Sequence, residues 1–240
     1  MSPRTANPAL GVQLLEAAAQ LLAEEGPAAL STRRLAAAVG TSTTAVYTHF
    51  GGKNDLVRAM VQEGFRLLDR HLGEVGESSD PVADICALGA AYRCNALEHR
   101  HLYGVMFGGA SLGGFSLTTE DRQHGRYTLN VLVRAVERGM ELGRLDTGDE
   151  YLVAHQMWVA LHGLVTLELG DYLVEPYDAD VCFEAQMTGL LVSVGADRDT
   201  VTAALRRHCG GTEELSGPPP GPARPSTEPP SRVLSSLDIE

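Results

Sequence analysis

The sequence lacks most of the features that identify an enzyme, a secreted protein or a disulfide-bonded domain. Its four cysteines form no C-x-x-C pair, which favours buried or free thiols in a reducing cytosol over a redox switch. The N-terminus has no charged region followed by an apolar run, so we expect no signal peptide. We find no G-x-S-x-G motif, nucleophile–base pair or metal-binding box, and therefore predict no catalytic residues, no metal and no cofactor.

Lysine is almost absent: Lys53 is the sole lysine, beside 18 arginines. The net charge of the chain is −12. The acidic charge is unevenly distributed along the chain. Residues 1–58 carry five basic and four acidic side chains, a balance of +1, which leaves −13 for residues 59–240. A near-neutral N-terminal part on an acidic remainder is compatible with contact to DNA at one end only, since the remainder repels the duplex.

The stretch Leu30–Asp55 predicts two short helices joined by a tight turn. Ser31 and Thr32 are good N-cap residues for the first helix. Gly40 follows where a chain must enter a left-handed conformation to leave a helix. Ser42 caps the second helix, of which one face carries small hydroxyl side chains and a tyrosine: Thr43, Thr44, Tyr47 and Thr48. Such a face suits a groove of DNA, and a merely solvated helical hairpin is the alternative.

Together these residues resemble the helix-turn-helix of TetR-family transcriptional regulators. The resemblance extends over about Leu10–Met60 and depends on the following positions: Thr32, Leu35, Ala36, Gly40, Ala45, Val46, Tyr47, His49, Phe50, Gly52, Lys53 and Leu56. It implies that Tyr47, His49 and Lys53 meet the phosphate backbone and that Thr43–Thr44 face base edges. The sequence departs from the family pattern at Arg33, where an acidic residue is common, and this adds positive charge near the DNA. The candidate DNA-binding residues are Thr32, Arg33, Ser42, Thr43, Thr44, Tyr47, Thr48, His49 and Lys53.

Helical spacing of apolar residues continues through the chain and predicts an all-α protein. We predict a three-helix DNA-binding domain over residues 1–55, in which Leu10–Glu25 packs behind the two helices of the helix-turn-helix. A larger helical ligand-binding and dimerisation domain follows over residues 56–209. One long helix, from Lys53 to about Val75, links the two domains. Residues 210–240, rich in proline and glycine, predict a disordered tail.

Three segments of the predicted ligand-binding domain raise local questions. The five glycines within Gly104–Leu117 predict a flexible loop, because the lysine of a phosphate-binding loop is missing. Residues 118–142 predict a helix that turns Tyr127 inward. The neighbouring polar residues Glu98, His99 and His101 match no metal-ligand spacing, and we interpret them as a solvated helix end.

The segment Tyr151–Leu167 contains no Asp, Glu, Lys or Arg. It is too short and too rich in polar residues for a membrane span, so we predict no membrane contact. A helix that is apolar all round must be covered on both sides, and a second subunit would provide the second cover. We therefore predict a homodimer held by helices around residues 151–172 and 179–195. The run Trp158-x-x-x-His162-Gly163 also resembles the Trp-His-Gly C-terminal domain of some TetR-like regulators.

Most aromatic side chains of the chain fall in the second predicted domain. We predict that eight residues line a ligand cavity, with plain core packing as the alternative: Phe65, Tyr92, Tyr103, Met106, Phe107, Tyr127, Trp158 and His162. The scarcity of inward basic residues disfavours a multiply anionic ligand. A neutral or cationic, largely apolar effector is therefore expected.

The family resemblance implies a cytoplasmic, ligand-responsive transcriptional regulator, in the first instance a repressor. It would bind a palindromic double-stranded DNA operator as a dimer and be released by the small-molecule effector. Two alternatives have no DNA-binding role: a helical adaptor, or a helical enzyme that uses a lone base such as His124, His155 or His162. Neither alternative accounts for the residues at the phosphate-contact positions.

Overall fold

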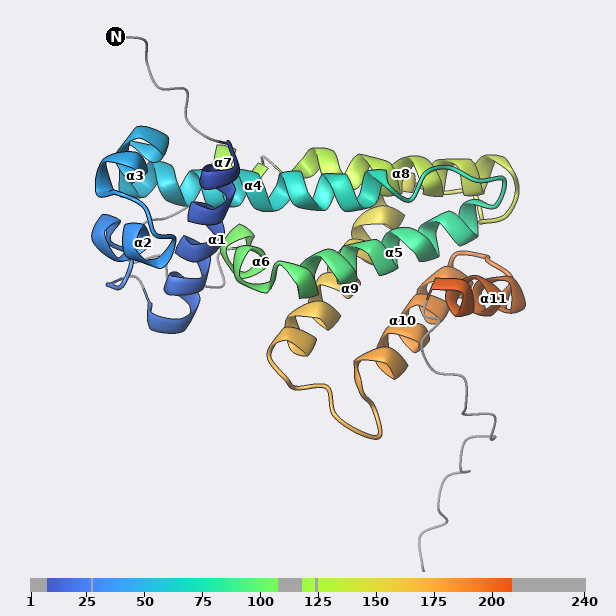
Figure 1. Ribbon diagram of the computed structural model, residues 1–240. Coiled ribbons are helices and arrows are strands. Elements are labelled where there is room, and N and C mark those ends of the chain that lie inside the picture. Colours follow the sequence, from blue (N-terminus) through green and yellow to red (C-terminus); the bar gives the residue numbers. More distant parts are fainter. Residues whose placement is uncertain (1–7, 27, 108–117, 124, 209–240) are drawn as a thin grey trace, which may run out of the picture. The chain divides into compact units, whose positions relative to one another are not determined.

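The computed structural model describes residues 8–26, 28–107, 118–123 and 125–208, and these form eleven helices and no strand (Figure 1). The all-α prediction is confirmed. Buried apolar side chains from Leu14 to Leu205 make one continuous core, which crosses the predicted domain boundary between residues 55 and 56 without a break. The predicted tail, residues 210–240, lies outside the described residues.

Three short helices form the N-terminal part: α1 (Pro8–Glu25), α2 (Thr32–Ala38) and α3 (Thr43–Phe50). The predicted caps are in place, because the Oγ of Ser31 accepts from the N–H of Arg34 and the Oγ of Ser42 accepts from the N–H of Ala45. Gly40, between α2 and α3, has φ 67°, the left-handed conformation that its position requires. Helix α1 packs against α2, which closes the three-helix unit around Leu14, Leu35 and Val46.

Helix α4 (Lys53–Gly73) continues from this unit into the rest of the protein. Its first turns contact α1 and α3, and the helix also packs against α5, α6 and α8. The buried side chains recur at helical spacing along its whole length: Leu56, Val57, Met60, Val61, Phe65, Leu67, Leu68 and Leu72. The predicted link between the two parts is therefore a single apolar-faced helix.

The larger C-terminal part is built around α5 (Pro81–Glu98), which contacts α4, α8, α9 and α11. Asp80 caps this helix and Pro81 is its first residue, as the sequence predicts. The remaining helices are α6 (Arg100–Met106), α7 (Thr119–Gln123), α8 (Arg126–Glu141), α9 (Glu150–Leu169), α10 (Ala179–Ser193) and α11 (Arg198–His208).

An ion-pair network with a largely buried centre, Arg93–Glu168, connects three of these helices. The guanidinium of Arg93 on α5 donates to both carboxylate oxygens of Glu168 on α9, over 2.7 and 2.6 Å. It also pairs with Asp180 on α10 at 2.6 Å. Bidentate pairing of this kind fixes the relative orientation of the helices as well as contributing energy. The hydrogen bond to Glu168 is the main reason why the pKa of Arg93 lies above its ordinary value.

Four details differ from the sequence predictions. Gly104 lies in α6 rather than in a loop. The side chains around it are buried and hold this helix against α4: Leu102, Tyr103, Val105 and Met106. Residues 108–117 of the predicted loop lie outside the described residues. Residues 118–142 form two helices instead of one. Tyr127 was predicted to point inward but is 40% exposed. Helix α11, packed on α5, was not predicted.

Helix α9 is long and apolar enough to cross a membrane by length and composition alone. It packs against α5, α8 and α10, and the core helix of a soluble protein passes the same test. One side of α9 nevertheless presents large apolar side chains to solvent: Tyr151, Leu152, Val159 and Leu167. Among the described residues, no helix covers that side of α9.

Candidate nucleic-acid interface and ligand site

Helix α3 separates a buried side from an exposed side at the positions that the sequence predicts. Val46 is 2% exposed and anchors α3 in the core, whereas Tyr47 is 57% exposed. The other members of the predicted outer face are exposed too: Thr43, Thr44 and Thr48. The outer face of α3 is therefore small, hydroxyl-rich and carries one projecting aromatic ring.

Two hydroxyl groups of this region form hydrogen bonds with the backbone of α3. The Oγ1–H of Thr48 donates to the carbonyl oxygen of Thr44 over 2.8 Å, so Thr48 offers acceptor lone pairs rather than a donor to the outside. The Oγ of Ser42 accepts from the N–H of Ala45 over 3.2 Å and keeps its own O–H. These bonds hold the first turn of α3 in a fixed geometry and place Thr43 and Thr44 beside it.

Four further candidate DNA-binding residues lie on or near α3 and differ in how far their side chains are buried. Arg33 and Lys53 are exposed, at the beginning of α2 and of α4 respectively. Thr32 is half-buried as the first residue of α2. His49 is half-buried and lies beside Gly11 of α1, where an added Cβ would be in ordinary van der Waals contact with its Nδ1 at 3.5 Å. The structure thus gathers two cations around the exposed face and sets His49 at its edge.

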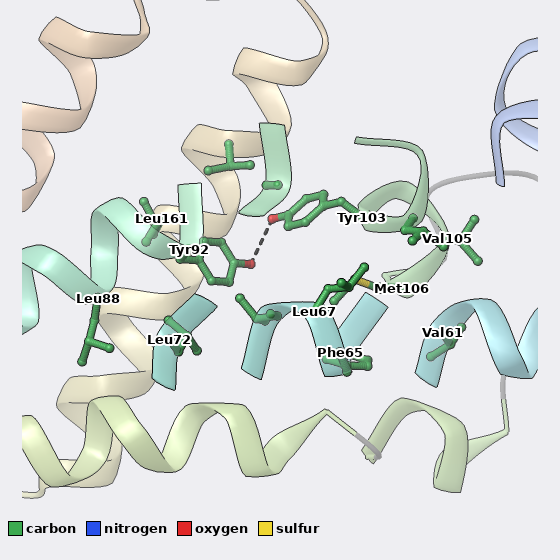
Figure 2. Packing of buried hydrophobic residues seen from close by; sticks show 14 of the residues in the cluster. Val61, Phe65, Leu67, Leu72, Leu88, Tyr92, Tyr103, Val105, Met106 and Leu161 are labelled. Atoms are coloured by element: carbon green, nitrogen blue, oxygen red, sulfur yellow. Dashed lines mark hydrogen bonds between the residues drawn. The ribbon is translucent and has the colours of Figure 1, made fainter. Parts of the chain in front are cut away.

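In the C-terminal part, three predicted ligand residues from three helices meet through their polar atoms. The hydroxyls of Tyr92 (α5) and Tyr103 (α6) are 2.9 Å apart. Figure 2 marks the hydrogen bond between them with a dashed line. The Nδ1 of His162 (α9) lies 2.6 Å from the Tyr103 hydroxyl and 3.3 Å from the Tyr92 hydroxyl. Because the ring nitrogen is closest to Tyr103, a consistent pattern has the Tyr103 O–H donating to Nδ1 and the Tyr92 O–H donating to the Tyr103 oxygen.

Aromatic rings enclose this polar group. The Phe107 ring centroid lies 4.4 Å from that of His162 and 5.0 Å from that of Tyr103. Trp158, one turn before His162 on α9, has its ring centroid 6.0 Å from that of His162. Phe65 of α4 meets Phe107 edge to face at 5.8 Å, and Met106 packs against Gly64, the residue before Phe65. Seven of the eight predicted ligand residues thus form one cluster, with three polar atoms inside an apolar surround.

The apolar surround changes the acid–base properties of the polar atoms. Burial raises the pKa of Tyr92 to about 12, against smaller opposing effects of hydrogen bonds with Tyr103 and Trp158. Burial likewise raises the pKa of Tyr103, and it lowers the pKa of His162 below its ordinary value. All three groups are therefore neutral near pH 7, which suits an uncharged ligand better than an anion.

Tyr127 is the predicted ligand residue that the structure does not bring into this cluster. It is on α8, and its electrostatic neighbours are Asp69 and Arg66 of α4. Conversely, helical periodicity did not indicate that Tyr92, Tyr103 and His162 share hydrogen bonds, because His162 is 70 residues from Tyr92 and the contact depends on how α9 crosses α5.

Two family models match the chain and together span more than half of it. Residues 14–60 match the bacterial regulatory proteins of the tetR family. Residues 85–190 match a tetracyclin repressor-like C-terminal domain. The second match is of this general kind and does not confirm the Trp-His-Gly subtype that the sequence resembles.

Curated relatives and solved structures agree with these matches. The chain is 27% identical over 190 residues to an uncharacterised HTH-type transcriptional regulator of Mycobacterium tuberculosis, covering 78% of this chain and 81% of that protein. It is 28% identical over 158 residues to the HTH-type transcriptional repressor KstR2 of the same organism, covering 62% of this chain and 78% of KstR2. A solved protein of unknown function from Rhodococcus sp. RHA1 superposes with a TM-score of 0.64 at 28% identity, covering 77% of this chain and 95% of that one.

The lowered pKa of His162 predicts a pH dependence of stability. In the unfolded chain this histidine titrates near its ordinary pKa of about 6.5, so the unfolded state binds more protons than the folded state between that pH and the lower folded pKa. Its contribution to stability is therefore complete above about pH 6.5 and is lost as the pH falls through the folded pKa. We expect urea unfolding to show a smaller loss of stability on acidification for His162→Gln than for the wild type.

Both proteins should be compared at the same concentration, because association also shifts apparent stability. The midpoint of the His162 ring resonances in an NMR titration provides a direct check. An unchanged pH dependence in His162→Gln, together with an ordinary midpoint in the wild type, would show that this ring is solvated.

Proposed function

We propose, from the premise that this chain is a TetR-family transcriptional regulator, that α3 enters the major groove of its operator and reads base edges with Thr43 and Thr44. Tyr47, His49 and Lys53 would hold phosphates, and Thr32, Arg33, Ser42 and Thr48 would lie along the same surface. The observation that carries the proposal is the exposed hydroxyl face of α3, held over the buried Val46. Small side chains permit close approach to base edges, and the flanking cations supply the sequence-independent part of the affinity.

The uncovered side of α9 supports a homodimer. Large apolar side chains are exposed on α9, on the connection to α10 and on α10 itself: Tyr151, Leu152, Val159, Leu167, Tyr172, Val174, Tyr177 and Val181. Contiguous exposed apolar surface of this kind is rare on monomers. A two-fold axis through α9 and α10 would present two copies of α3, and such an arrangement requires a palindromic operator.

Repression in the cytoplasm, relieved by a small apolar effector, is the regulatory outcome we propose. The repressor role is supported by the relative KstR2, which is named a repressor. The effector site would be the cluster around Tyr92, Tyr103 and His162, where an uncharged polar group on the ligand would exchange hydrogen bonds with these three atoms. The charged groups of α5 and α9 nearby, Arg93 and Glu168, already neutralise each other, which again disfavours an anionic ligand.

Helix α6 connects the proposed effector site to the helices of the DNA-binding part. It carries Tyr103 in the cluster and contacts both α1 and α4. A ligand that displaces α6 would therefore act on two helices that support α3. Release from DNA requires that ligand and operator prefer different positions of these helices, and the difference in affinity sets the strength of the response.

One DNA-binding experiment distinguishes a residue that contacts phosphates from residues that select bases. Lys53→Ala should weaken binding to selected operator and to random DNA similarly, and should lower the slope of log K against log salt by about 1, because one phosphate contact is lost. Thr43→Ala and Thr44→Ala should instead change which bases are selected from a random library. Arg198→Ala, which removes an exposed positive charge at the beginning of α11, is the matched control.

A salt slope equally reduced by Lys53→Ala and Arg198→Ala would mean that only net charge matters. Unchanged base preference in both threonine variants would place the reading residues elsewhere than on α3. Absence of any sequence preference in the wild type would reject the operator-binding function as a whole.

The dimer surface has its own test. Val159 is 61% exposed within the chain, so Val159→Glu places a charge on the proposed interface without disturbing the core. We expect the dissociation constant of the dimer to rise at least about 100-fold, because an unpaired carboxylate would be buried twice at the two-fold axis. Leu142→Glu, at the 59% exposed C-cap of α8, is the control and should stay dimeric in analytical ultracentrifugation. A dimeric Val159→Glu would move the interface away from this face of α9.

The effector site is testable with the sole tryptophan of the chain, Trp158. A fraction of an organic cell extract that dissociates the operator complex should also change Trp158 emission. Tyr103→Phe keeps the ring and removes the hydroxyl, so it should raise the amount needed for release about 10-fold while leaving ligand-free DNA affinity unchanged. Tyr127→Phe is the control outside the cluster. Equal responses of wild type and Tyr103→Phe would place the effector elsewhere.

A further inference from the structure

Three potential metal ligands converge where α4 ends and α5 passes into α6. His71 is in the last turn of α4, Glu98 is the last residue of α5, and His99 lies between α5 and α6. One ligand atom from each side chain lies within 4.8 Å of the other two. The imidazole rings of His71 and His99 face each other nearly at right angles, with centroids 5.9 Å apart.

The hydrogen bonds of His71 leave its outer nitrogen facing an acceptor. Its Nδ1 lies 3.1 Å from the carbonyl oxygen of Leu67, which can only accept, so Nδ1 carries the proton. In the neutral ring, Nε2 then presents a lone pair, and it lies 3.1 Å from an oxygen of the Glu98 carboxylate. Two lone pairs at this distance repel unless a positive charge lies between them. The same arrangement, with the inner N–H held by a backbone carbonyl, is the usual one for metal-binding histidines.

His99, the third member of the cluster, has an unsatisfied ring nitrogen. Its Nε2 is buried and has no hydrogen-bond partner among the described residues. A buried polar atom without a partner costs free energy, and each such atom calls for a ligand, an ion or a water. Protonating His71 would satisfy the pair with Glu98 but would leave this nitrogen as it is.

We propose that His71, Glu98 and His99 form a binding site for a divalent first-row transition metal such as Zn²⁺. Two imidazole nitrogens and one carboxylate are a common ligand set for zinc, with water completing a tetrahedron. Metal–ligand bonds of about 2.0 to 2.1 Å separate adjacent tetrahedral ligands by about 3.3 Å. The separation of His71 and Glu98 already approaches that value, and a small rotation of His99 completes the set.

The side chains around the proposed site suit a reversibly bound ion. The Glu98 side chain is 62% exposed and the His71 side chain 15% exposed, so an ion can enter from solvent along the carboxylate. Bound there, the metal would fix the C-terminal turn of α4 to the junction of α5 and α6. If the proposed DNA-binding function holds, this is the far end of the helix that begins beside the operator surface. The metal site itself does not depend on that function.

The sequence expectation of no metal rested on Glu98, His99 and His101, whose spacing fits no single ion. In the structure His71, 27 residues before Glu98, takes the place of His101 in the cluster. His101 is therefore a matched control: a histidine on the same helix junction that is outside the three-residue group.

Titration of the untagged, EDTA-treated and reduced full-length protein with Zn²⁺ and with Co²⁺ tests the proposal. Calorimetry should give one strong site per chain, and Co²⁺ should give the visible bands of a four- or five-coordinate ion. His71→Ala and His99→Ala should each weaken Zn²⁺ binding at least about 100-fold, whereas His101→Ala should bind like the wild type. Glu98→Ala, at an exposed position, should weaken binding without affecting folding, which circular dichroism checks.

Thermal unfolding and NMR provide readouts that need no DNA. Zn²⁺ should raise the melting temperature of the wild type and of His101→Ala, and should leave that of Glu98→Ala unchanged. The ring resonances of His71 and His99 should shift together at one equivalent of Zn²⁺. Binding that survives both His71→Ala and Glu98→Ala would assign the ion to other groups such as the thiols. Unshifted ring resonances would show that His71 and Glu98 form an ordinary ion pair, and either result would overturn the proposal.

Discussion

The continuity of helix α4 is the constraint on which the rest of the structure depends. Its buried stripe begins at Leu56, against the helices that carry the exposed face of α3, and ends at Leu72, within the C-terminal core. A single helix cannot bend sharply without losing backbone hydrogen bonds, and no proline interrupts it. One uninterrupted helix therefore contacts both the N-terminal helices α1 and α3 and the C-terminal helices α5, α6 and α8.

Two polar clusters of the C-terminal part involve α5 or α6 together with a helix distant in the sequence. Tyr103 on α6 bonds to Tyr92 and His162, while His71 at the end of α4 meets Glu98 and His99. A buried polar group favours one arrangement strongly when all partners are present and destabilises it when one is missing. The positions of α6 and of the α5–α6 junction therefore depend on whether these polar atoms keep their partners.

The apolar side chains of α9 show the opposite situation, because the described residues cover only one side of this helix. Arg93, Glu168 and Asp180 fix α9 against α5 and α10 on the inner side. On the outer side Leu152 and Val159 are exposed, and burial of each large apolar side chain stabilises by roughly 1.5 to 3 kcal/mol. The ion pairs thus fix the inner side of α9, while these apolar side chains of its outer side are left exposed.

The sequence by itself determined the helices, their caps and the outward face of α3, because those depend on residues within a few turns of one another: Ser31, Gly40, Ser42 and Val46 act locally. Of the eight ligand candidates that it indicated, seven lie in one cluster, since aromatic residues are few in the chain. Tertiary structure alone decided that Tyr127 points outward, that Gly104 lies in a helix, and that His71 joins Glu98 and His99. Those outcomes depend on how helices far apart in the chain cross, and periodicity gives the buried side of each helix without giving its neighbour.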